Sequence, residues 1–333
     1  MSRAGRYRAA MKAAVYDRYG PPEVVRVLDV PKPVAADDEV LVRIHATTVN
    51  RTDCGFRAPR PWFIRPVSGM VRPRYRILGN EFAGDVEAVG RAVTTFAVGD
   101  RVFGYDDGAW GGHAEYRTVR ENASLARIPA ALSYLQAAPA TEGSHYALAN
   151  ITKANIRAGQ RVLVNGATGA IGSAAVQLLA ARGVHVTGVC DTAHLDLVRG
   201  LGAERVIDRT AVDFTRDGEV YDAVFDAVGK SSFGRCRRLL TPRGVYLSTD
   251  LGPLGQNPLL WATTPLLPGR SALFGFPRHD QAMMNDLKDL MERGQFRPLV
   301  DRTYPLAEIV AAYRYVESGQ KIGSVVIAVA PAD

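Results

Sequence analysis

A turn of small residues joins an apolar strand to an apolar-faced helix in the stretch "RVLVNGATGAIGSAAVQLL", residues 161–179. Glycines let a backbone approach a pyrophosphate closely, while free N–H groups and the positive helix end stabilise its charge. The spacing departs from G-x-G-x-x-G because Ala167 takes the first position, and a plain tight turn is the alternative. The preceding strand and following helix favour dinucleotide binding. The predicted binding residues are Gly166, Ala167, Thr168, Gly169, Ala170, Ile171 and Gly172.

The end of the second strand bears on which dinucleotide binds. In "HVTGVCDTAH", Asp191 directly follows the strand. An acid there can hydrogen-bond the ribose hydroxyls of NAD and repel the 2′-phosphate of NADP. Alternatively, Asp191 faces solvent or caps the helix that begins near Thr192. His194 and Arg209 argue against a preference for NADH, because the cationic side chain of Arg209 could reach a 2′-phosphate. These residues leave NADH and NADPH both open.

The elements around the turn predict two kinds of domain. From residue 11 to about 125, short strand-like runs are broken by Gly, Pro and Asp, which predicts a mostly β domain. From about 130 to 276, apolar strands alternate with helical patterns, which predicts an α/β fold with a doubly wound parallel sheet. The tail returns to short strand and helix signals. We expect domain segments at residues 1–128, 129–276 and 277–333.

Composition indicates an ordinary globular protein of 333 residues, of which 47% are hydrophobic and 23% charged. No apolar run approaches the ~20 residues that span a bilayer, and the N-terminus lacks a signal-peptide core. We therefore expect a cytoplasmic protein with no membrane partner. The three cysteines are widely spaced, which predicts reduced thiols rather than disulfides or a cysteine-rich zinc lobe.

The segment from Cys54 to Asn80 contains no acid but many arginines and aromatic rings. A nucleic-acid site would use the arginines on phosphates and the rings for stacking. The segment lacks a recognised nucleic-acid module. We therefore expect a solvated loop that covers a cleft, and no nucleic-acid partner. Its residues of note are Arg57, Arg60, Arg65, Arg72, Arg74, Arg76, Phe56, Trp62, Phe63 and Tyr75.

The order of domains resembles the medium-chain dehydrogenase/reductase superfamily from Met11 onward. Five motifs look like its zinc-independent quinone oxidoreductase branch: "VNRTDCGFR", "ILGNEFAGDVEAVG", "VGDRVFGY", "GATGAIG" and "YDAVFDAVG". The resemblance implies a GroES-like, mostly β catalytic domain, a Rossmann cofactor domain and a tail that returns to the catalytic domain. Members of that branch often use NADPH, which favours NADPH slightly. Relatives commonly form homodimers through edge strands, for which "SALFGF" is the candidate here.

The zinc positions of the superfamily are altered. Alcohol dehydrogenases of this superfamily carry a Cys shortly before a Thr/Ser-Asp pair and a His after the Gly of a later G-H-E motif. Here those positions hold Asn50 and Asn80, and an amide is a poor zinc ligand. Near the third position stand Glu142 and His145, without a Cys. We predict no catalytic zinc, which puts alcohol dehydrogenase activity in doubt.

A conjugated acceptor fits a site without zinc, because hydride can add to the β-carbon while charge spreads to a hydrogen-bonded oxygen. The resemblance implies that Asn50, Asp53 and Arg57 lie at the cleft floor, with Asn50 as the donor to that oxygen. Asp53 and Arg57 would pair to shape the site, or form an ordinary salt bridge that supports the loop. His145 beside Tyr146, at the domain junction, could donate a proton or contact the nicotinamide, or could simply pack.

The resemblance also implies cofactor contacts at the ends of later strands. Val228 and Gly229 would lie near the adenosine or pyrophosphate. Ser248, Phe274 and Phe276 would come near the nicotinamide.

Three function classes follow. We predict an NAD(P)H-dependent oxidoreductase that transfers hydride to a quinone, enone or related conjugated carbonyl of a small-molecule substrate. The alternatives are an enoyl-thioester reductase or alcohol/aldehyde dehydrogenase of the same superfamily, and a cofactor-binding protein with a nucleic-acid or structural role.

Overall fold

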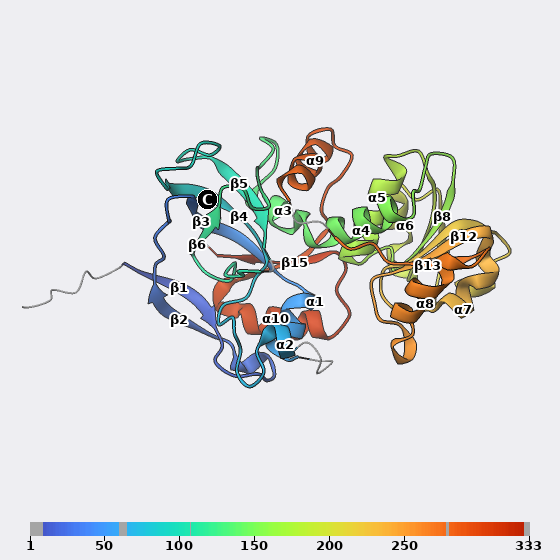
Figure 1. The fold of residues 1–333 in the computed structure, drawn as a ribbon, viewed down its shortest axis with the longest axis horizontal. Helices are drawn as coiled ribbons and strands as arrows, with labels where there is room; N and C mark the ends of the chain where they lie inside the picture. The colour runs from blue at the N-terminus through green and yellow to red at the C-terminus, as the bar shows by residue number, and fades with distance from the viewer. Residues whose placement is uncertain (1–8, 60–64, 107, 278–279, 330–333) are drawn as a thin grey trace, which may run out of the picture. The chain divides into compact units, whose positions relative to one another are not determined.

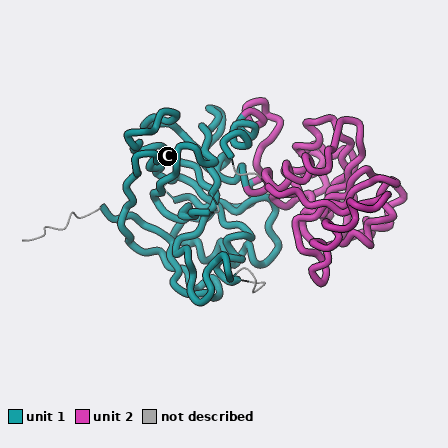
Figure 2. The backbone as a smooth tube through the Cα atoms, in the orientation of Figure 1, with its two compact units in different colours: residues 1–141, 279–288, 300–333 teal, residues 142–278, 289–299 magenta. Residues whose placement is uncertain are grey.

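The chain forms two compact units in the computed structural model, and each unit is discontinuous in sequence (Figure 2). The first unit contains residues 1–141, 279–288 and 300–333, and the second contains residues 142–278 and 289–299. The residues that the structure describes are 9–59, 65–106, 108–277 and 280–329. Within these ranges, none of the helices combines the length and the apolar character that crossing a membrane requires.

The first unit is built on a seven-stranded, largely antiparallel sheet (Figure 1). Its strands, with the separate pair β1–β2, are β1 (Ala10–Val15), β2 (Arg26–Pro31), β3 (Glu39–Val49), β4 (Glu81–Val89), β5 (Arg101–Tyr105), β6 (Tyr116–Arg120), β7 (Leu125–Arg127), β14 (Val300–Pro305) and β15 (Ser324–Ala328). The order is β14-β15-β3-β4-β5-β7, and β6 also pairs with β3. The long strand β3 is rich in Val, Ile and Thr, which favour a pleated, buried surface. Its end delivers the chain to Asn50.

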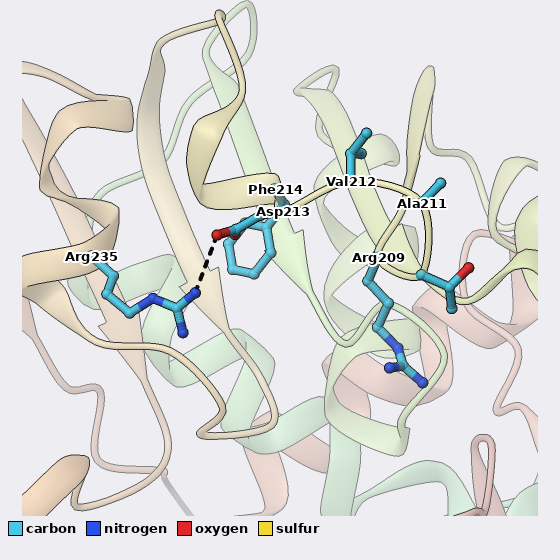
Figure 3. Close-up of a pocket in the computed structure, with 7 residues that line it drawn as sticks. Arg209, Ala211, Val212, Asp213, Phe214 and Arg235 are labelled. Carbon is cyan, nitrogen blue, oxygen red and sulfur yellow. Dashed lines mark hydrogen bonds and ion pairs between the residues drawn. The ribbon is translucent and has the colours of Figure 1, made fainter.

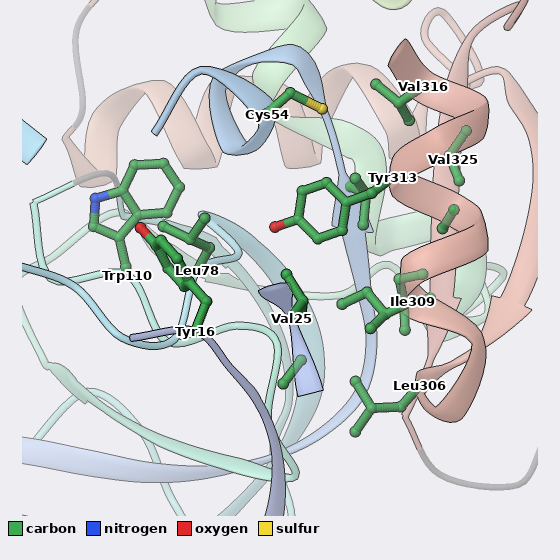
Figure 4. Packing of buried hydrophobic residues seen from close by; sticks show 14 residues of the cluster. Tyr16, Val25, Cys54, Leu78, Trp110, Leu306, Ile309, Tyr313, Val316 and Val325 are labelled. Carbon is green, nitrogen blue, oxygen red and sulfur yellow. The ribbon is translucent and has the colours of Figure 1, made fainter. Parts of the chain in front are cut away.

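A helix from the C-terminal part of the chain completes the core of the first unit. The helices of this unit are α1 (Arg51–Arg57), α2 (Arg65–Ser68), α3 (Tyr134–Ala137) and α10 (Ile309–Glu317), while α9 (Gln281–Glu292) crosses between the two units. Ile309, Tyr313 and Val316 are spaced to share one face of α10. All three are buried in a cluster with Val25 and Val325 (Figure 4). The returning tail is therefore part of the first unit's core.

The second unit is a parallel six-stranded sheet in the order β10-β9-β8-β11-β12-β13. Its elements are β8 (Arg161–Asn165), β9 (His185–Cys190), β10 (Arg205–Asp208), β11 (Tyr221–Asp226), β12 (Leu240–Ser248), β13 (Ser271–Leu273), α4 (Glu142–Lys153), α5 (Ala170–Ala180), α6 (Leu195–Gly200), α7 (Phe233–Cys236) and α8 (Asn257–Thr263). The strand order reverses between β8 and β11, and doubly wound sheets bind ligands at such a switch point. The predicted fold class, an α/β chain with a GroES-like β domain and a Rossmann domain, is confirmed.

Candidate functional site

The glycine turn lies at the switch point, between the end of β8 and the start of α5. Gly166 has a φ of 81°, and a Cβ there would lie 2.3 Å from Cγ1 of Val228. A Cβ at Gly172 would lie 2.0 Å from the carbonyl oxygen of Gly166. Both positions therefore require glycine. Gly169 is the N-cap of α5 and has no side chain to accept from the first N–H groups of the helix, which suits them to bind an anion.

A buried carboxylate fixes the neighbouring loop after β11. Asp226 is fully buried and accepts hydrogen bonds from Asn165 Nδ2 at 2.9 Å and from the backbone N–H of Ser231 at 2.7 Å. These bonds tie the loop that carries Val228 and Gly229 to the end of β8. The half-exposed Val228 covers Gly166. Sequence reasoning missed Asp226, although an acid at the end of an apolar strand, in "DAVFDAVG", was the available signal.

The carboxylate of Asp191 is held by two side chains. It accepts a hydrogen bond from the ring of His194 and lies 3.5 Å from Nη2 of Arg209. Asp191 occupies an N-cap position, but its side chain makes no capping hydrogen bond. Of the alternatives open from the sequence, capping is therefore excluded. The charge of Asp191 is offset by Arg209, whose own side chain is 59% exposed.

A pocket of about 340 Å³ opens beside Arg209 (Figure 3). In Figure 3 the guanidinium of Arg235 reaches Asp213, at 3.5 Å, while that of Arg209 extends from the other side of the loop. A guanidinium group can bind a phosphate through charge-assisted hydrogen bonds. The complete lining is Arg209, Thr210, Ala211, Val212, Asp213, Phe214 and Arg235.

The helix that carries His145 packs against the glycine turn. A Cβ at Gly143 would lie 2.4 Å from the carbonyl oxygen of Ala170, so α4 contacts the first turn of α5 closely. His145 is buried, with its ring 4.4 Å from that of Tyr146. Further along α4, Asn150 accepts a hydrogen bond from the backbone N–H of Gly275. The structure thus brings α4, the glycine turn and the segment after β13 together within the second unit.

The three residues predicted near the nicotinamide lie at or after the ends of β12 and β13. Ser248 is buried and accepts from the backbone N–H of Asp250 at 3.3 Å. The ring of Phe274 stacks on Trp261 and meets Phe276 edge to face, with centroids 4.5 and 4.9 Å apart. Phe276 is 81% exposed, and its approach to the nicotinamide stays a prediction.

In the first unit, Asn50 caps α1 through a reciprocal pair of hydrogen bonds. Asn50 Oδ1 accepts from the backbone N–H of Asp53 at 3.0 Å, and Asp53 Oδ2 accepts from the backbone N–H of Asn50 at 2.9 Å. The sequence folds this way because Asn and Asp stand at the N-cap and N3 positions. Asn50 Nδ2 donates one N–H to Asn80 Oδ1 at 2.7 Å. Its second N–H has no acceptor among the described residues.

Asp53 also joins α1 to the turn that carries Asn80. Its Oδ1 accepts from the backbone N–H of Gly79 at 2.9 Å, and its side chain is fully buried. Asn80 in turn donates to the hydroxyl of Tyr105 at 3.4 Å. Asn50 and Asn80 are therefore fixed relative to each other both directly and through Asp53.

The prediction that Asp53 forms an ion pair with Arg57 is wrong. The fully buried guanidinium of Arg57 donates to the carbonyl oxygen of Gly20 and to the carboxylate of Glu317 at the end of α10. Asp53 lies in the first turn of α1, where backbone N–H groups take its oxygens, while Arg57 lies in the last turn, next to Glu317. Arg57 thus ties α1 to α10 rather than shaping the site through Asp53.

The donor groups at the zinc positions do not fit a zinc ion. Asn50 and Asn80 are amides that hydrogen-bond each other, whereas zinc sites in proteins use thiolate, imidazole and carboxylate. The neighbouring Glu81 is buried and already accepts from Thr48 Oγ1 at 2.7 Å and from the backbone N–H of Thr141 at 2.9 Å. Within the described ranges, no three His, Cys, Asp or Glu residues are grouped to hold a metal.

His113 supports the strand that leads to Asn50, and sequence reasoning missed it. Its Nε2–H donates to the carbonyl oxygen of Thr48 at 2.7 Å, and Nδ1 accepts from the hydroxyl of Tyr313 at 3.4 Å. Burial lowers the pKa of His113 from 6.5 to about 4, so the ring is neutral near pH 7. A neutral ring matches this pattern of one donor and one acceptor.

The depressed pKa predicts a loss of stability in mild acid. Between about pH 6.5 and about pH 4 the unfolded chain binds a proton at His113 and the folded chain does not, which costs up to about 3 kcal/mol. Urea unfolding should show that the free energy of unfolding falls between about pH 7 and about pH 5. The fall should be smaller by about 2 kcal/mol in His113→Gln than in the parent protein. Equal drops in both proteins would contradict a neutral, buried His113.

Comparison with known proteins identifies the family. Residues 36–130 match the family described as "Alcohol dehydrogenase GroES-like domain", and residues 201–327 match "Zinc-binding dehydrogenase". The quinone oxidoreductase of Pseudomonas aeruginosa is 31% identical over 95% of this chain and 99% of its own length. A tomato 2-methylene-furan-3-one reductase is 30% identical over 95% of this chain and 79% of its own. The solved structure of the quinone oxidoreductase from Coxiella burnetii superposes with a TM-score of 0.85 at 25% identity, covering 97% of this chain and 100% of that one. The chain is therefore an oxidoreductase of the medium-chain dehydrogenase/reductase superfamily and belongs to its quinone oxidoreductase-like members.

Proposed function

We propose that the protein is a zinc-independent reductase that uses NADPH or NADH to reduce a quinone, enone or related conjugated carbonyl. The observation that carries this proposal is the amide of Asn50, which is held by its cap and keeps one uncommitted N–H. A preorganised neutral donor stabilises negative charge that develops on an acceptor oxygen. The names of the relatives, quinone oxidoreductases and a reductase of a methylene-furanone, support the same class of acceptor.

Residues of both units have distinct roles in this proposal. When bound, the nicotinamide cofactor supplies the hydride. The N–H groups at the start of α5 bind the pyrophosphate, with Val228 and Gly229 beside it. Asn50 holds the acceptor oxygen, and Asp53 keeps the Asn50 side chain in place through the reciprocal cap. His145 is the candidate proton donor to the reduced product.

The site supports a preference for NADPH. The charge of Asp191 is offset by Arg209, and Arg209 and Arg235 both line the pocket beside it. Replacing Arg209 with Gln should weaken NADPH binding about tenfold to hundredfold, the worth of a charge-assisted hydrogen bond, and leave NADH binding nearly unchanged. Quenching of protein fluorescence during titration measures both affinities. Arg199→Gln, which removes another exposed arginine of the same unit, is the control. Equal losses for NADPH and NADH would contradict a role at the 2′-phosphate.

Turnover of a defined acceptor panel tests the proposed reaction. Purified protein should bind NADPH and oxidise it in the presence of quinones and enones, with little turnover of saturated aldehydes. Faster turnover of enoyl thioesters than of quinones and enones would replace this acceptor class with acyl thioesters. Failure to bind either nicotinamide cofactor would overturn the proposal.

A further inference from the structure

A short loop follows α2 (labelled in Figure 1) and is closed by a backbone hydrogen bond. We call residues 68–74 the 68–74 loop. The backbone N–H of Arg74 donates to the carbonyl oxygen of Ser68 at 2.7 Å, which closes the loop at its base. The hydroxyl of Tyr19 donates to the carbonyl oxygen of Gly69 at 2.6 Å. A Cβ at Gly69, where φ is 122°, would lie 2.1 Å from the carbonyl oxygen of Arg72. Position 69 therefore requires glycine, and hydrogen bonds hold the loop backbone at Ser68, Gly69 and Arg74.

The tip of this loop is apolar and faces outward. Met70 is 65% exposed and Val71 is 83% exposed, and Val67 in the preceding turn of α2 is 58% exposed. Apolar side chains that gather at a surface and are rimmed by polar groups indicate a binding surface.

The rim of the tip is strongly basic. Arg65, Arg72 and Arg74 are exposed, and none of them pairs with a carboxylate among the described residues. By contrast, the nearby Arg76 is paired with Asp17 at 2.6 Å. No acid occurs anywhere in the sequence between Cys54 and Asn80. Arg60, Trp62 and Phe63, which belong to the same arginine-rich stretch, lie outside the described residues.

We propose that the 68–74 loop binds the surface of an anionic lipid membrane, an ability separate from the reductase activity. The aliphatic tip would enter the boundary between headgroups and acyl chains, and the arginines, which lack a carboxylate partner among the described residues, would bind the anionic headgroups. A nucleic-acid site would instead present aromatic rings for stacking, whereas this tip is aliphatic. The described residues contain no helix that could span a membrane. Surface binding through a loop requires no such segment.

Sedimentation with lipid vesicles tests the proposal on the full chain. We expect binding to vesicles of phosphatidylcholine mixed with phosphatidylserine, weak binding to phosphatidylcholine alone, and release by salt. Arg72→Gln and Arg74→Gln should each weaken binding about fivefold, and the double variant Met70→Ser with Val71→Ser should abolish it. The matched controls are Val98→Ser and Arg91→Gln, which alter exposed side chains elsewhere in the same unit and should bind like the parent.

A fluorescent reporter tests vesicle binding without relying on variants that lose it. Val71→Trp places an indole at the tip, and its emission should shift to the blue when the phosphatidylserine vesicles are added. Absence of the shift, binding that is equal for both vesicle types, or unchanged binding in the loop variants would overturn the proposal. RNA binding that depends on Arg72 and Arg74 but not on Met70 and Val71, without vesicle binding, would assign the loop to nucleic acid instead.

Discussion

Replacing Asn50 with serine should lower kcat/KM for a quinone by about hundredfold while the protein remains folded. Serine is also a good N-cap and can still accept from the backbone N–H of Asp53. It lacks the amide N–H that we propose for the acceptor oxygen, and removal of one such donor typically costs about 10²–10³ in kcat. Steady-state oxidation of NADPH measures the change, and thermal unfolding confirms that α1 is still capped.

A reciprocal exchange of cap residues provides the control. Ser133 caps α3 with a reciprocal pair of its own, so Ser133→Asn swaps the same two residue types away from the site. This variant should keep the activity of the parent. If Asn50→Ser also kept that activity, the Asn50 amide would not be the donor to the acceptor oxygen.

Replacing Gly172 with alanine should weaken NADPH binding about tenfold to hundredfold. The new Cβ would lie 2.0 Å from the carbonyl oxygen of Gly166, so either the turn or the start of α5 must move. The N–H groups that we propose for the pyrophosphate would then lose one or two charge-assisted hydrogen bonds. Overpacking of this kind also lowers the free energy of unfolding by about 1–3 kcal/mol. Fluorescence titration and urea unfolding measure the two effects.

Gly200 offers a matched substitution in the same unit. It ends α6, and a Cβ there would meet no atom within 4 Å. Gly200→Ala should therefore stabilise the protein by about 0.5–1 kcal/mol and leave NADPH binding unchanged. Loss of affinity in both variants, or in neither, would contradict the assignment of the turn to the cofactor.

The parallel sheet and its glycine turn could be predicted because their signals are local. An apolar strand, a run of small residues and an apolar-faced helix follow each other within residues 161–179. The conformation of the turn then follows from glycine itself, because the close approach of Gly172 to Gly166 admits no side chain. The contacts of Asp191 are only partly local. His194 is three residues away in sequence, but Arg209 directly follows the next strand, β10.

The contacts of the candidate site in the first unit depend on pairings between distant segments, which periodicity does not reveal. Asn50 meets Asn80 because β3 and β4 pair in a register that sets Thr47 opposite Phe82. Arg57 meets Glu317 across 260 residues, because α10 packs beside α1. The family resemblance implied a pair of Asp53 with Arg57, but the backbone N–H groups of Asn50 and Gly79 take the carboxylate oxygens of Asp53.

Turnover by metal-free protein tests the central claim most directly. The protein would be treated with a chelator, its zinc content measured, and NADPH oxidation followed with a quinone before and after zinc is added. We predict full activity without zinc and no gain on its addition, because amides occupy the positions of the zinc ligands. Loss of activity in the chelator and its recovery with zinc would contradict a reductase that relies on the Asn50 amide.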